Sequence, residues 1–109
     1  MNVESLKKIL KNCTEENICC NEPHISLRCS ENATTKESIV HVMLKETNRL
    51  INVIQARADV YKVYFQLSKR RQLKVVIDFI QPRKIMIRTI KILDRKLYKN
   101  IKRIKRRRW

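Results

Sequence analysis

The sequence predicts an all-α protein, a small helical bundle with a long central helix, a break at Pro82 and a basic amphipathic C-terminal helix. The 109-residue chain contains no glycine and two prolines, so tight turns lack their most common residue. It is also rich in Lys, Leu, Ile and Glu, which helices accommodate well. A chain of this length allows one domain, and we expect residues 1–109 to form a single helical one.

Charge is the strongest feature of the composition. The formal net charge is +16 and the pI is near 10.3, which suits nucleic acid, an anionic membrane surface or an acidic protein partner. The chain has no apolar run approaching 18 residues and does not begin with a signal-peptide pattern. We therefore expect a soluble intracellular protein whose four cysteines stay reduced.

The first segment, residues 1–13, has the pattern of a short helix. Val3, Leu6, Leu10 and Cys13 are spaced by 3, 4 and 3 residues, which places them on one helical face. The charge of this segment is balanced, so the helix is expected to pack against the rest of the protein.

Residues 14–35 are expected to form a loop, because Asn, Thr, Ser and a proline cluster there. Thiols and an imidazole in or beside this loop suggest zinc ligands, but two of the cysteines are adjacent, which is a poor ligand spacing. Buried free thiols are the favoured interpretation, so the sequence predicts no metal site. A catalytic Cys–His pair is disfavoured because nothing orients the histidine. The residues concerned are Cys13, Cys19, Cys20, Cys29 and His24.

A long helix is expected over residues 36–81, with Thr35 or Ser38 as its N-cap. Its apolar stripe has helical spacings of three and four residues. Within it, residues 73–80 are ambiguous, since their β-branched side chains also favour a strand; we expect a helix because no partner strand is evident. The stripe comprises Ile39, Met43, Thr47, Leu50, Ile54, Ala58, Tyr61 and Phe65.

The C-terminal segment, residues 82–109, is expected to be a basic helix that begins at Pro82. Residues 83–109 contain 13 basic side chains and one acidic one, Asp94. An apolar stripe runs along this segment through Met86, Ile90, Leu93, Leu97, Ile101 and Ile104.

This last segment also carries a family resemblance. The run from Arg88 to Trp109 resembles the second half of the helical domain of GINS subunit 1, a family of subunits in the eukaryotic replicative helicase assembly. Residues 37–46 resemble the second helix of that family more loosely. Family members continue past the Arg-Trp pair into a small β-rich domain, and the printed sequence leaves open a truncated form, a reduced homologue or a fragment. The matching residues are Arg88, Leu93, Leu97, Tyr98, Arg103, Ile104, Arg108 and Trp109.

The resemblance implies a non-enzymatic structural subunit in the nucleus. Its partners would be the other GINS subunits and replicative helicase components, with DNA as a possible further partner. No catalytic residue, cofactor, small-molecule substrate or membrane contact is implied. The expected partner interface consists of Leu93, Leu97, Tyr98, Ile101, Ile104 and Trp109.

The alternative function is sequence-independent nucleic-acid binding through the basic C-terminal helix. Such binding would weaken steeply with salt. The six aromatic residues are not interleaved with the basic run, as a stacking platform for single strands would require. A membrane-surface helix is disfavoured, because the apolar stripe is narrow and a lone terminal Trp is a weak anchor. The expected phosphate contacts are Arg103, Lys105, Arg106, Arg107 and Arg108.

Overall fold

The computed structural model describes residues 1–81 and 83–94, which form three α-helices, two 3-10 helices and five β-strands. In chain order the elements are α1 (Val3–Lys11), η1 (Glu15–Asn17), β1 (Ile18–Cys20), α2 (His24–Glu31), α3 (Lys36–Lys45), η2 (Thr47–Arg49), β2 (Leu50–Arg57), β3 (Val60–Gln66), β4 (Arg71–Gln81) and β5 (Lys84–Asp94). No helix within this part of the chain is long and apolar enough to cross a membrane.

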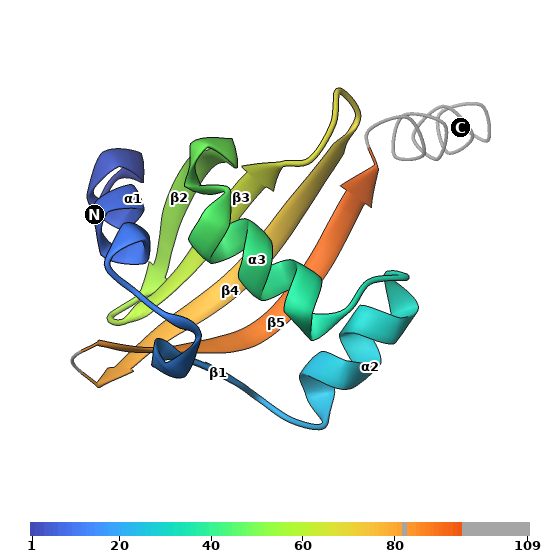
Figure 1. Cartoon of the computed structure of the whole chain (residues 1–109), viewed down its shortest axis with the longest axis horizontal. Helices are drawn as coiled ribbons and strands as arrows, with labels where there is room; N and C mark the ends of the chain where they lie inside the picture. The colour runs from blue at the N-terminus through green and yellow to red at the C-terminus, as the bar shows by residue number, and fades with distance from the viewer. Residues whose placement is uncertain (82, 95–109) are drawn as a thin grey trace, which may run out of the picture.

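The strands form one mixed sheet in the order β1-β5-β4-β3-β2. Strands β2 to β5 follow one another as antiparallel neighbours. The short strand β1 pairs parallel to β5, with Ile18 opposite Ile85 and Cys20 opposite Ile87. Figure 1 shows α3 crossing the sheet, with β1 and α2 beside β5.

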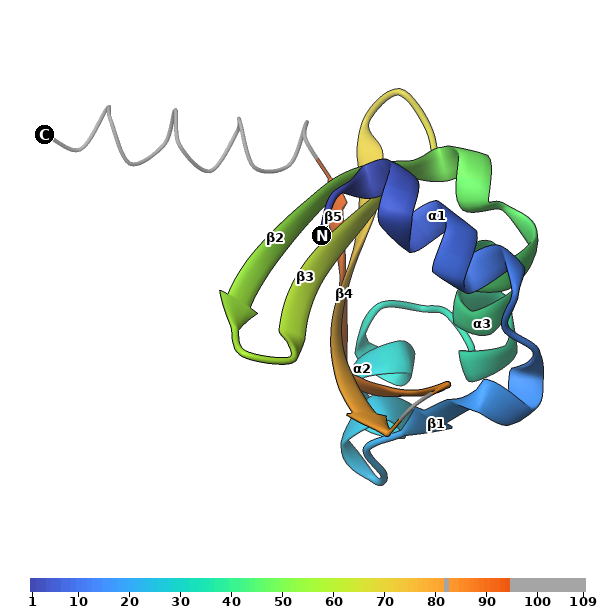
Figure 2. The same ribbon diagram turned by 90° about the vertical axis from the view of Figure 1, so that its left-hand side faces the viewer.

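The molecule has two layers. Helices α1 and α3 lie on one face of the sheet, and no described helix covers the other (Figure 2). The core between the layers is apolar, and each fully buried aliphatic side chain in it contributes about 1.5–3 kcal/mol. From the helices it takes Leu6, Leu10, Ile25, Cys29, Ile39 and Met43, and from the strands Leu50, Val63, Phe65, Leu73, Val75, Ile77, Ile85, Ile87 and Ile90.

The helices begin at side-chain caps. Asn2 accepts a hydrogen bond from the Ser5 backbone N–H over 2.8 Å at the start of α1, and Thr35 accepts one from the Ser38 N–H over 3.1 Å at the start of α3. Each cap satisfies one of the amide groups that a helix N-terminus leaves without an intrahelical partner.

The predicted all-α bundle is wrong, because much of the chain from residue 50 onward is sheet. Helix α3 ends at Lys45, and β2, β3 and β4 occupy most of the expected long helix. The apolar stripe at helical spacing does not describe this region: Ile54 on that stripe is 46% exposed, whereas Val63, which lies off it, is fully buried. Alternation with a period of two governs burial in β3 and β4.

The expected basic helix is also wrong over residues 84–94, which form β5. Ile77 lies opposite Ile87, whereas the preceding Val76 lies opposite Thr89, so Arg88 is an extra residue in β5. This β-bulge places Ile87 and Ile90 on the same sheet face although they are three residues apart. The expected helical stripe instead joined Ile90 to Met86, which adjoins the buried Ile87 on the strand and therefore points to the other face.

The lack of glycine was a misleading argument against a sheet. Two of the described residues adopt the left-handed backbone region that glycine usually fills: Ala33 with φ of 53° and Arg83 with φ of 66°. Arg83 lies between β4 and β5. Non-glycine residues pay about 1–2 kcal/mol for this conformation, a cost that the paired strands and the packed core exceed.

Candidate functional site

The sheet face opposite the helices carries several lysines among other polar and apolar side chains. Because Val63 and Phe65 point into the core, the residues between and beside them point to the other side. We call this side the open face. It carries Asn52, Ile54, Lys62, Tyr64, Lys74, Val76, Thr89 and Lys91, which occupy matching positions on β2 to β5.

Strand register aligns these side chains in rows. Tyr64 lies opposite Lys74, and Lys74 lies opposite Lys91, which makes one row across three strands. The neighbouring row joins Lys62 to Val76 and Val76 to Thr89. Directly opposite side chains in an antiparallel pair have Cβ atoms about 5 Å apart, so positive charges separated along the chain become neighbours.

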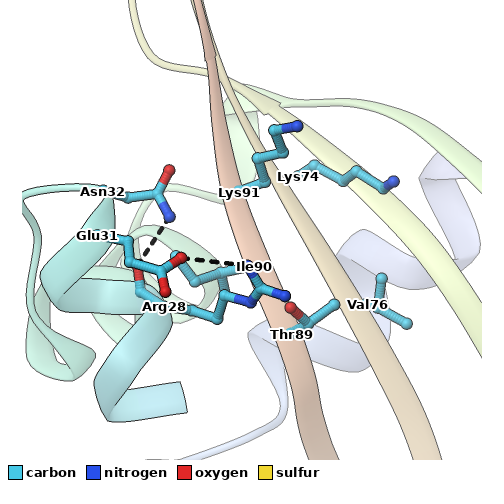
Figure 3. A pocket seen from close by; sticks show the side chains of 8 residues that line it. All are labelled: Arg28, Glu31, Asn32, Lys74, Val76, Thr89, Ile90 and Lys91. Atoms are coloured by element: carbon cyan, nitrogen blue, oxygen red, sulfur yellow. Dashed lines mark hydrogen bonds and ion pairs between the residues drawn. The ribbon is translucent and has the colours of Figure 1, made fainter. Parts of the chain in front are cut away.

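Two hollows meet on the open face. The first, of about 350 Å³, lies between α2 and the middle of β4 and β5; Figure 3 shows Arg28 extending from α2 toward Thr89, with Lys74 and Lys91 on the adjacent strands. It is lined by Arg28, Glu31, Asn32, Lys74, Val76, Thr89, Ile90 and Lys91.

The second hollow, of about 590 Å³, lies between the end of β2 and the start of α2. Val76 and Thr89 line both hollows, so the two hollows adjoin, and we call them together the groove. The second hollow is lined by Asn21, His24, Ala56, Arg57, Val60, Val76, Arg88 and Thr89.

The groove has more positive charge than its acidic residues neutralise. Arg28 pairs with Glu31 over 3.1 Å, but both side chains are exposed, so the pair adds little stability. Within residues 1–81 and 83–94, no salt bridge involves Lys74, Lys91 or Arg57. These three cations therefore face the groove without an acidic partner from the described chain.

Arg88 lies close to an acidic residue, Asp78, but its Nε–H does not form a hydrogen bond with it. Its Nε atom lies 3.1 Å from Oδ2 of Asp78, yet its N–H does not form a hydrogen bond of acceptable geometry. At this distance the two charged groups form an ion pair. The Asp78 carboxylate thus lowers the positive charge of the groove at its second hollow.

The thiols and His24 do not converge on a metal site. Cys19 and Cys20 lie on β1 and Cys29 on α2, and no group of three or more possible ligands occurs within the described residues. Burial raises the pKa of the Cys13, Cys20 and Cys29 thiols, so they are protonated at neutral pH and weakly nucleophilic. His24 instead lines the groove.

The expected interface residues fall mostly outside the described chain. Leu93 is on β5, opposite Gln72 and partly buried, rather than on a helix. The remaining ones lie outside the described residues, as do the expected phosphate contacts: Leu97, Tyr98, Ile101, Ile104 and Trp109, and Arg103, Lys105, Arg106, Arg107 and Arg108.

The sequence patterns did not predict the open face. The signal was present in Val60–Gln66, where Lys62, Tyr64 and Gln66 alternate with buried residues. Reading this stretch at a period of two would have placed Lys62 and Tyr64 on one face. It would not have shown that Lys74 and Lys91 lie beside them.

Comparison with known proteins assigns no identity to this site. The chain matches no protein-family model, no curated protein sequence and no solved structure.

Proposed function

We propose that this protein is a non-enzymatic, sequence-independent nucleic-acid-binding protein that holds the phosphate backbone in the groove. One observation carries the proposal: Lys74, Lys91 and Arg57 face the same depression without acidic partners within the described residues. Lys and Arg contacts to phosphate supply most of non-specific nucleic-acid affinity.

The charge of the whole chain supports this proposal. A net charge of +16 raises the local concentration of polyanions and speeds their association. Residues 95–109 contribute nine Lys and Arg residues and no acidic one. Arg103, Lys105, Arg106, Arg107 and Arg108 stay proposed phosphate contacts that add to the groove.

The test is a binding measurement over a range of salt concentrations. Fluorescence anisotropy with a labelled 20-nucleotide strand would compare the wild type with the Lys74→Gln/Lys91→Gln double variant. The variant should bind more weakly, and its slope of log affinity against log salt should be shallower by about 0.7 per lost phosphate contact. Unrelated nucleotide sequences should give similar affinities.

The matched control removes two lysines from the helix layer. Lys8 on α1 and Lys45 on α3 are exposed, so Lys8→Gln/Lys45→Gln makes the same change in net charge away from the groove. Equal losses in both double variants would mean that net charge alone drives binding and would overturn the role of the groove. If the wild-type protein bound anionic lipid vesicles as tightly as it binds the labelled strand, the result would point to a membrane surface instead of nucleic acid.

A structural role in a GINS assembly is the second proposal, and it rests on the sequence pattern of Arg88–Trp109. The helical-domain argument for it no longer holds over residues 88–94, because these are part of β5. Co-expression with the other three GINS subunits, followed by size-exclusion chromatography with light scattering in high salt, tests it. A stable assembly with one copy of each subunit would support nuclear replication as the setting; a chain that elutes alone would reject it.

A further inference from the structure

One aromatic side chain occupies the open face among the described residues. Phe65 is fully buried in the core, and Tyr61 and Phe79 pack edge to face with ring centroids 5.6 Å apart beside that core. Tyr64 alternates with Val63 and Phe65 on β3, is partly exposed, and points to the other side of the sheet.

Cations surround Tyr64. Lys74 is directly opposite it on β4, Lys91 continues the row on β5, and Lys62 is two residues away on the same face of β3. The fold thereby brings Lys74 and Lys91 beside an aromatic side chain that is 10 or more positions away in the sequence. Tyr64 does not line the groove but lies beside it, opposite the groove residue Lys74. An exposed aromatic ring next to a row of cations is the arrangement that binds single strands without sequence preference.

We infer that the open face takes single-stranded nucleic acid along the row Tyr64–Lys74–Lys91, with one base stacked on Tyr64 beside the groove and the adjoining phosphates on Lys74 and Lys91 within it. Only an unpaired base can offer its flat face to a side chain, because in a duplex both faces are covered by neighbouring base pairs. This inference rests on the proposed function and adds to it the form of the ligand and the residue that selects that form.

The experiment compares four ligands of equal length: oligo(dT), oligo(rU), a DNA duplex and an abasic DNA strand, which keeps the phosphates but lacks bases. Wild-type protein should bind the single strands more tightly than the duplex or the abasic strand. Similar affinity for oligo(dT) and oligo(rU) would show that stacking and phosphate contact suffice, whereas a preference for oligo(rU) would assign RNA as the ligand.

The variant Tyr64→Ala should weaken oligo(dT) binding by roughly fivefold to a hundredfold, the range that base–aromatic stacking covers. It should leave the salt slope and the affinity for the abasic strand unchanged, because it removes no cation. Tyr64→Phe should bind like the wild type, since it keeps the ring.

The matched control is Ile54→Ala. Ile54 is an exposed apolar side chain on the same face, opposite Lys62 on the neighbouring strand, so this change removes apolar surface without removing a ring. It should leave oligo(dT) affinity unchanged. Tyr64→Leu serves as a second variant if Tyr64→Ala does not fold, and circular dichroism of each variant checks the fold.

The outcomes separate the two proposals. If wild-type protein binds none of the four ligands, the proposed function itself fails. If it binds them but Tyr64→Ala and Tyr64→Leu bind oligo(dT) as tightly as the wild type, nucleic-acid binding stands and the stacking role is overturned. Tighter wild-type binding to the duplex than to either single strand would overturn the single-strand inference as well.

Discussion

The side-chain Oδ1 of Asn32 accepts a hydrogen bond from the backbone N–H of Ile92 over 2.9 Å, although the two residues are 60 positions apart. The Nδ2 of the same side chain donates to the carbonyl oxygen of Arg28 over 2.7 Å. The side-chain amide of Asn32 thereby caps the C-terminus of α2 and also accepts the hydrogen bond of a backbone N–H of β5. It holds α2 beside the strand and so fixes one wall of the groove.

Replacing Asn32 by Ala should lower the free energy of unfolding by about 1–3 kcal/mol, because it leaves a partly buried backbone donor without a partner. Urea unfolding followed by circular dichroism measures the change. Asn48→Ala, at an exposed position in η2, is the control and should have little effect. A loss no larger than in this control would show that water satisfies the Ile92 N–H equally well.

Two isoleucines on β4 distinguish a strand from a helix directly. Ile77 is fully buried and Ile80 is 43% exposed; residues three apart lie on opposite faces of a strand but near one face of a helix. Ile77→Ala should destabilise the protein by about 2–5 kcal/mol, and Ile80→Ala by less than about 0.5 kcal/mol. Similar unfolding midpoints for the two variants in urea would contradict the strand.

Ala33 occupies a position where glycine is better suited. The N–H of Thr34 donates to the Cys29 carbonyl over 2.9 Å and the N–H of Ala33 to the Ser30 carbonyl over 3.1 Å, which is the Schellman ending of a helix. Because Ala33 has φ of 53°, Ala33→Gly should stabilise the protein by roughly 0.5–1 kcal/mol after allowing for the greater unfolded-state freedom of glycine.

Thermal unfolding measures the effect of Ala33→Gly, and Ala58→Gly between β2 and β3 provides the control. Ala58 is not among the described residues with positive φ, so glycine there adds unfolded-state entropy without relieving any strain. A lower melting temperature for Ala33→Gly than for the wild type would contradict the backbone argument.

Removing the acid at the groove should strengthen binding. Asp78→Asn takes the negative charge away from Arg88, which lines the groove, and so should lower the Kd for a single strand severalfold and steepen its salt dependence. The Asp78 side chain is only 16% exposed, but asparagine keeps an oxygen acceptor beside Arg88, so the free energy of unfolding should fall by about 0.5–1.5 kcal/mol.

The control for Asp78→Asn changes charge by the same amount elsewhere. Glu4 pairs with Lys7 on α1 over 3.8 Å, in the helix layer, so Glu4→Gln alters net charge without altering the groove. Titration of both variants with the same labelled strand separates the local effect of the charge beside Arg88 from the effect of net charge. An equal gain from both substitutions would assign the effect to net charge and reject a local one.

How far the sequence predicted the structure depended on the range of the interactions. The cap at Thr35 and the helical face of Leu6 and Leu10 are local features, visible in a few consecutive residues, and the structure contains both. The strands were missed although β2 to β5 are consecutive antiparallel neighbours, because a chain without glycine lacks the usual sequence signals of the turns between such strands.

The sequence by itself determined the strong positive charge, the helix starts, and the apolar content that had to be buried. Tertiary structure decided where that charge acts. Lys74 and Lys91 are 17 positions apart in the sequence, and Tyr64 is ten positions before Lys74, yet strand pairing places the three in one row. The physical reason is that backbone hydrogen bonds between strands set the register, and register alone determines which side chains share a face and become neighbours.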